Sequence, residues 1–250
     1  MDFSAINDIY NGYKNATVST NVHPDDVMYN SGKGFYYQVG EDGLRVVLRG
    51  LSHTWCQKVN RILDIPCGHG RVARHLRTGF PGAEMFFCDI DKTGVDFCAK
   101  EFGGKGLYSE PDLTNVKLPE KLDLIWVGSL FTHVDRDRTA KWMKHLASHL
   151  NEHGILVATF RGLSQSGSMD FGGEADKEKL QRDFSETGFG FAVYKRFEKE
   201  NYGTTLVRPS AVCAIAEQIA DTRILSYVER GWANRQDVLI LCKHDRMKKM

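Results

Sequence analysis

The chain has 250 residues, of which 42% are apolar and 11% aromatic, enough for a substantial core in one large α/β domain or two small ones. With 33 Lys plus Arg against 32 Asp plus Glu, its near-neutral charge gives no reason to expect a nucleic acid or an anionic membrane surface as partner. No stretch approaches the ~18 apolar residues of a membrane span, and the acidic N-terminus lacks the apolar run of a secretory signal.

The first 60 residues precede any repeating pattern. They hold five tyrosines, several turn residues and a helical pattern over Glu41–Leu51. We expect residues 1–60 to form a cap packed on a single compact domain of residues 61–250. The cap is either a structural appendage or a lid that helps to form a substrate pocket, because tyrosine offers both apolar area and a hydroxyl.

From residue 61, apolar runs alternate with helical stretches, which predicts a mostly parallel sheet with helices on both faces. The expected strands are Arg61–Ile65, Ala83–Cys88, Gly106–Ser109, Leu122–Gly128 and Gly154–Phe160. The expected helices are Arg71–Thr78, Lys92–Phe102 and Asp135–Asn151, the last of them capped by Asp135.

After Phe160 this rhythm stops. A loop over Arg161–Gly173, rich in Gly and Ser, precedes two short strands, FGFAVY and YGTTLV, that lie outside the repeat. A helix over Pro209–Ala220 follows, with proline in its first turn. The last two strands, Arg223–Glu229 and Asp237–Cys242, are joined by too few residues for a crossover helix, so they must be antiparallel.

The stretch RILDIPCGHGRVARHL, residues 61–76, predicts a ligand-binding loop. Its glycines follow a strand and open a helix, where backbone N–H groups can approach an anionic group closely. The spacing of Gly68, Gly70 and Ala73, with Asp89 21 residues beyond Gly68, also fits a dinucleotide fingerprint. A nicotinamide-dependent oxidoreductase is therefore one interpretation.

Three features favour a different ligand. Asp64 closes the strand before the glycines, where it would repel a pyrophosphate and attract the ammonium of an amino-acid-like ligand. A separate cap precedes the loop, and the antiparallel ending breaks the order of a dinucleotide-binding sheet.

Together these features resemble the class I S-adenosylmethionine-dependent methyltransferases. The family's first motif, E/D-x-G-x-G-x-G, corresponds to Asp64-Ile-Pro66-Cys-Gly68-His69-Gly70, with proline in place of the first glycine. The resemblance implies a Rossmann-like seven-stranded sheet with an antiparallel last strand, and S-adenosylmethionine as cofactor. It further implies that Asp89 binds the ribose and that the cofactor site also includes Ile90, Asp112, Leu113 and Ser129.

The candidate catalytic residue is His133, just beyond the fourth strand, where open α/β sheets bind ligands. A hydroxyl acceptor needs a general base, and His133 is placed to serve, although a lone histidine in a turn fits slightly better as one that caps or packs at the next helix. The residues Val127-Gly-Ser129-Leu replace the N/D-P-P-Y/F of nucleic-acid and glutamine amino methylases. We therefore expect O-methylation of a small molecule, such as a sugar or biosynthetic intermediate, with a non-catalytic binding module as a further alternative.

Neither the cysteines nor a run of three spaced histidines predicts a disulfide framework or a metal site. The six cysteines form no C-x-x-C pair, which favours reduced thiols in a cytoplasmic protein. His145, His149 and His153 recur at a spacing of four, but no cysteine or carboxylate motif completes a ligand set around them. We expect no bound metal there, and the sequence does not predict an oligomeric state.

Overall fold

A computed structural model of the chain describes residues 1–56, 58–165 and 175–244. One sheet contains the seven strands β1 (Arg61–Asp64), β2 (Glu84–Asp89), β3 (Lys105–Tyr108), β4 (Leu122–Val127), β5 (Leu150–Phe160), β8 (Thr222–Trp232) and β9 (Gln236–Lys243). Their spatial order is β3-β2-β1-β4-β5-β9-β8. Strands β1 to β5 are parallel, and β9 is antiparallel to β5 and β8, which confirms the predicted sheet and its ending.

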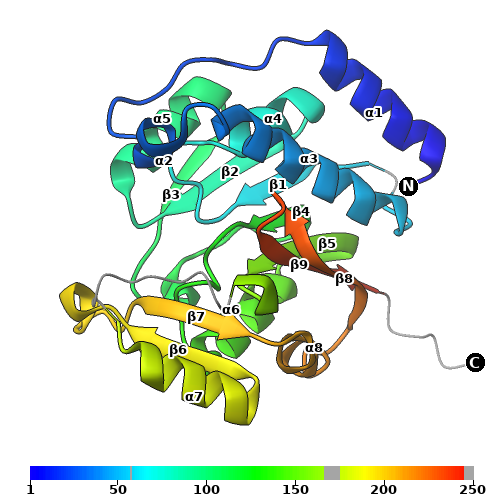
Figure 1. Cartoon of the computed structure of the whole chain (residues 1–250). Helices are drawn as coiled ribbons and strands as arrows, with labels where there is room; N and C mark the ends of the chain where they lie inside the picture. Colours follow the sequence, from blue (N-terminus) through cyan, green and yellow to red (C-terminus); the bar gives the residue numbers. More distant parts are fainter. Residues whose placement is uncertain (57, 166–174, 245–250) are drawn as a thin grey trace, which may run out of the picture.

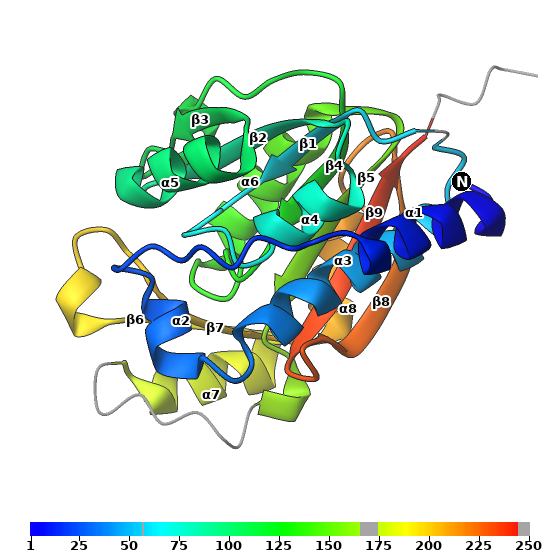
Figure 2. The ribbon, with the colours of Figure 1, turned by 90° about the horizontal axis from the view of Figure 1, so that it is seen from above.

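Helices cover both faces of this sheet (Figure 1). On one face lie α1 (Phe3–Asn15), α3 (Tyr36–Ser52), α4 (Ala73–Gly79) and α5 (Lys92–Phe102), with the short α2 (Val27–Gly32) at its edge. On the other lie α6 (Arg136–Ser148) and α8 (Pro209–Ala216). Figure 2 shows α3 crossing its face in front of β9 and β8.

A small second sheet, with one helix packed on it, lies beside α6 (Figure 1). The hairpin of β6 (Phe189–Val193) and β7 (Gly203–Val207) forms a separate two-stranded sheet, against which α7 (Lys177–Thr187) packs. These are the two strands predicted outside the repeat. Backbone hydrogen bonds from β7 to residues 132–133 attach the hairpin to the segment that follows β4.

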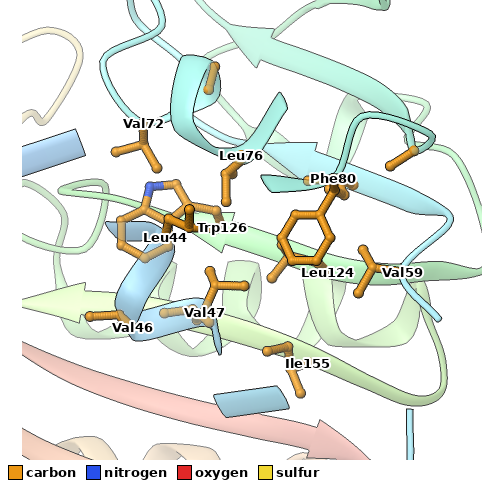
Figure 3. Packing of buried hydrophobic residues seen from close by; sticks show 14 of the residues in the cluster. Leu44, Val46, Val47, Val59, Val72, Leu76, Phe80, Leu124, Trp126 and Ile155 are labelled. Carbon is orange, nitrogen blue, oxygen red and sulfur yellow. The ribbon is translucent and has the colours of Figure 1, made fainter. Parts of the chain in front are cut away.

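Side chains along the strands alternate between two cores, as strand geometry requires. Ile62 and Trp126 belong to the core beneath α3 and α4, whereas Leu63 and Ile125 belong to the core beneath α6 and α8. Figure 3 shows the first core, where Leu44 of α3 lies beside Trp126. The N-terminal helix α3 therefore supplies part of the core of the sheet.

The predicted elements differ from the structure mainly at their ends. Asp135 caps α6 as predicted, since its side chain accepts the N–H of Arg138. The predicted continuation of this helix to residue 151 is wrong, because α6 ends at residue 148 and Leu150 already pairs with Leu122 in the sheet. Likewise α8 ends at residue 216 rather than 220. Helices α1, α2 and α7 were not predicted.

Within residues 1–56, 58–165 and 175–244, every helix is too short or too polar to cross a bilayer. The same residues contain no group of three side chains placed to hold a metal ion. Most of the predicted 161–173 loop, from residue 166 onward, lies outside the described residues.

Candidate functional site

The glycine loop between β1 and α4 adopts backbone conformations that its glycines permit. Gly68 has φ +48° and Gly70 has φ +81°. A Cβ atom on Gly70 would lie 2.2 Å from Cε2 of Phe102, so only glycine lets the loop pack against α5. A Cβ atom on Gly68 would meet nothing within 4 Å. The loop is thus fixed on the side of α5 and open beside Gly68.

Asp64, at the end of β1, has a carboxylate oxygen without a hydrogen-bond partner among the described residues. The residue is 2% exposed, and Oδ2 has no hydrogen-bond partner among those residues. Burial, with a smaller contribution from the charge of Asp89, raises the pKa of this carboxyl well above its usual value. An unpaired buried carboxylate costs folding free energy, which a bound cationic group would offset.

Asp89 ends β2 and contacts the glycine loop. Its Oδ2 accepts the N–H of Gly68 at 2.7 Å, and its Oδ1 accepts the N–H of Asp91 at 3.0 Å. Burial raises its pKa. The next residue, Ile90, is 64% exposed, so an acidic group and an apolar surface lie together at the end of β2.

The side chain of His69 lies between α5 and the N-terminal segment. Its ring stacks on His23 with centroids 4.7 Å apart, and its Nε2 lies 3.8 Å from Oδ2 of Asp91. Pro66 follows a cis peptide bond in the same loop. The side chain of His69 thus joins the loop to the N-terminal segment.

Residues 16–26, here called the strap, cross the glycine loop and are held there by Arg74. This arginine is 1% exposed, and its guanidinium donates to the carbonyls of Ser19 at 2.7 Å, Asn21 at 3.0 Å and Gly70 at 3.1 Å. Glu101 accepts from the side chains of the same two strap residues. Sequence reasoning missed this arrangement, because an arginine within a helical pattern gives no signal that its partners are 55 residues away.

Asp112 and Leu113 are held by other contacts. The carboxylate of Asp112 accepts from Lys141 at 2.6 Å and Trp142 at 3.1 Å, both on α6, and these donors lower its pKa. Leu113 is buried in the core beneath α6 and α8. The structure therefore ties this segment to α6, while Asp64, Gly68, Gly70 and Asp89 gather at the ends of β1 and β2.

Ser129 follows β4 in a strained conformation, with φ +64°. Its N–H donates to Oγ1 of Thr159 at 2.8 Å, and its Oγ accepts from Nε2 of Gln236 at 2.9 Å. The end of β4 is in this way fixed to β5 and β9.

His133 lies against the β6–β7 hairpin. Its Nδ1–H donates to the carbonyl of Gly203 at 2.8 Å, and its ring stacks on Tyr202 with centroids 4.7 Å apart. Burial and the nearby charge of Arg161 lower its pKa to about 4, so the imidazole is neutral at pH 7. Because Nδ1 holds the proton, Nε2 is left as an acceptor. Neither Tyr202 nor Arg161 was predicted as a site residue, since Tyr202 comes from the hairpin and Arg161 from the end of β5, both distant from His133 in the chain.

Comparisons with known proteins agree with this fold. Residues 63–156 match a family model described as a methyltransferase domain. An S-adenosylmethionine-dependent methyltransferase from Clostridium acetobutylicum matches with a TM-score of 0.59 at 13% identity, over 87% of this chain and 99% of its own. A protein from Pyrococcus horikoshii matches with a TM-score of 0.60 at 14% identity, over 89% and 96%.

A third similar structure, from Burkholderia thailandensis, is 1,6-didemethyltoxoflavin-N1-methyltransferase with bound 1,6-didemethyltoxoflavin and S-adenosylhomocysteine. It has a TM-score of 0.54 and 11% identity, over 87% of this chain and 84% of its own. At such identities the likeness concerns the fold. Residues 63–156 thus match a methyltransferase domain, and the strand order is that of the class I S-adenosylmethionine-dependent methyltransferase fold, as the ordered motifs predicted.

Proposed function

We propose that the protein transfers the methyl group of S-adenosylmethionine to a hydroxyl of a small molecule, with His133 as general base. The observation that carries this proposal is the hydrogen bond from Nδ1 of His133 to the carbonyl of Gly203, which leaves Nε2 as the acceptor. With a pKa of about 4, that nitrogen is unprotonated throughout the neutral range. The attacking hydroxyl becomes acidic as its C–O bond forms, so even a weak base can then take its proton.

The residues at the ends of β1 and β2 fit the cofactor. Asp64 would pair its unsatisfied carboxylate with the ammonium of the methionine part, and the open side of Gly68 would receive the carboxylate. Asp89 would accept from the ribose hydroxyls, and the exposed Ile90 would cover the adenine. The proposed set also includes Pro66, His69, Gly70, Asp112, Leu113 and Ser129. When bound, the cofactor supplies an electrophilic methyl on a sulfonium, which the protein aligns with the acceptor.

Two observations support a small-molecule acceptor. The chain has a formal charge of only +1, whereas proteins that bind nucleic-acid backbones concentrate positive charge. The similar Burkholderia thailandensis enzyme has a small molecule bound. A role in biosynthesis within the cytoplasm belongs to the same proposal, supported there by six free cysteines.

Calorimetric titration with S-adenosylhomocysteine and with NADPH tests the cofactor. We expect only the first to bind, and to lose affinity in Asp89→Ala. Binding of NADPH alone would favour the oxidoreductase.

Methyl transfer is tested by release of S-adenosylhomocysteine with acceptor sets that share a skeleton and differ in carrying a hydroxyl, an amine or a thiol. We expect turnover of hydroxyl acceptors, reduced ~100-fold or more in His133→Asn with cofactor affinity unchanged. Preference for amines or thiols, or equal turnover by the variant, would contradict O-methylation with a histidine base. Cofactor binding without turnover of any set would favour a binding module.

A further inference from the structure

Arg161 stands at the carboxyl end of β5, directly after Phe160, and is held firmly there. Its Nη1 donates to the carbonyl of Thr132 at 3.0 Å and to Oγ1 of Thr204 at 2.7 Å. Both threonines are fully buried, so the guanidinium is anchored between the segment after β4 and strand β7. Because the guanidinium is planar, the two hydrogen bonds made by Nη1 fix the orientation of the whole group.

The positive charge of Arg161 has no acidic partner within the described part of the chain. No carboxylate there lies within ion-pair distance of it. The acid nearest in strand register is Asp237, opposite Phe160, but its oxygens accept from the hydroxyl of Tyr227 and the N–H of Arg230. Among these residues, Nε and Nη2 of Arg161 also have no acceptor. These two nitrogens lie on one edge of the guanidinium, from which two parallel N–H groups can donate to the two oxygens of a carboxylate.

Arg161 lies close to the proposed base, because its partners Thr132 and Thr204 are the chain neighbours of His133 and of Gly203, to which His133 is hydrogen-bonded. Its charge lowers the pKa of His133 and opposes the rise in the pKa of Tyr202, so the guanidinium is electrostatically close to both rings. With a pKa of about 12, Tyr202 keeps its proton and remains a hydrogen-bond donor. A cation, a donor and a base thus lie close together at the β6–β7 hairpin.

We propose that the methyl acceptor carries a carboxylate, which the Nε–Nη2 edge of Arg161 binds while the reacting hydroxyl is presented to His133. The inference rests on the proposed function, because it specifies the acceptor of that reaction. It assigns Arg161 as the residue that selects an anionic acceptor over a neutral one of the same shape.

Binding of two matched probes tests the assignment. The full chain, saturated with S-adenosylhomocysteine, is titrated with sodium 4-hydroxybenzoate and with 4-hydroxybenzamide, and binding is followed by ligand-observed NMR. We expect the carboxylate to bind at least tenfold more tightly than the amide, and Arg161→Gln to remove that preference. Equal binding of the two probes, no binding of the benzoate, or a preference that persists in Arg161→Gln would overturn the proposal.

Further variants and an anion control make the result specific. Arg182→Gln removes an exposed arginine of α7 and should leave the preference intact. Arg161→Lys keeps the charge but not the two-nitrogen edge, and we expect intermediate affinity; full affinity would overturn bidentate binding. Inorganic phosphate that binds where benzoate does not would assign a phosphate acceptor instead. Failure of the protein to bind S-adenosylhomocysteine in the same samples would count against the proposed function, whereas failure of the carboxylate arm alone counts against Arg161.

Discussion

Arg74→Met should release the strap from the glycine loop. The substitution keeps an apolar side chain of similar length but removes every donor, so the carbonyls of Ser19 and Asn21 lose the hydrogen bonds that hold the strap. A hydrogen bond to a charged group contributes about 1.5 kcal/mol or more, so these two amount to at least about 3 kcal/mol. Gly70 still accepts from the backbone N–H of residue 74, which limits the loss on its side.

We expect the free energy of unfolding, measured in urea, to fall by about 3 kcal/mol, and amide exchange over residues 16–26 to accelerate strongly. Three aromatic rings within 5.2 to 5.6 Å of the guanidinium, those of Tyr36, Tyr37 and Phe102, also lose a cation–π contact. Because Gly70 belongs to the glycine loop, affinity for S-adenosylhomocysteine should fall several-fold.

Arg77→Met is the matched control for this experiment. Arg77 lies one turn further along α4 and also donates to backbone carbonyls, but to those of Phe102, Gly103, Pro81 and Ala83. Its loss should destabilise the protein without accelerating exchange in the strap. If Arg74→Met left exchange over residues 16–26 unchanged, or if Arg77→Met accelerated it equally, the assignment of Arg74 as the anchor of the strap would be refuted.

Three further predictions follow from buried groups. Asp64→Asn should raise the free energy of unfolding at pH 7 by about 1–2 kcal/mol while abolishing binding of S-adenosylhomocysteine; a less stable variant would show that the carboxylate is satisfied. Gly70→Ala should lower Tm by several degrees, because the residue has φ +81° and its new Cβ atom would clash with the ring of Phe102. In the control Gly82→Ala the new Cβ atom meets no atom within 4 Å, so Tm should not change; an equal Tm for the two variants would contradict this. His75, buried with a pKa of about 4 instead of 6.5, contributes up to about 3 kcal/mol of stability that is present above pH 6.5 and lost as pH falls toward 4. Urea titrations across that range should show a shallower loss in His75→Gln than in the natural chain.

Much of the fold could be predicted from local pattern. The alternation of apolar runs and helical stretches predicted the strands of the sheet, and the short linker before Asp237 predicted the antiparallel ending. Lys92–Phe102 was predicted to the residue, because a cap and a following glycine mark its ends. The boundary at Asn151 failed because the pairing of Leu150 with Leu122 depends on a distant strand, which outweighs local helical preference.

The glycine loop could be predicted from the sequence alone as a ligand-binding loop. Its acid, glycines and second acid occur at a fixed spacing on consecutive strands, and the ends of parallel strands meet at one edge of the sheet. The surroundings of that loop and of His133 depend instead on contacts between segments that are distant in the chain. Arg74 donates to a carbonyl of the strap 55 residues away, and Arg161 donates to the hydroxyl of Thr204. The hydrogen bond from His133 to the carbonyl of Gly203 fixes the tautomer of the imidazole. Each of these contacts joins segments that only folding brings together, so no local pattern could predict them.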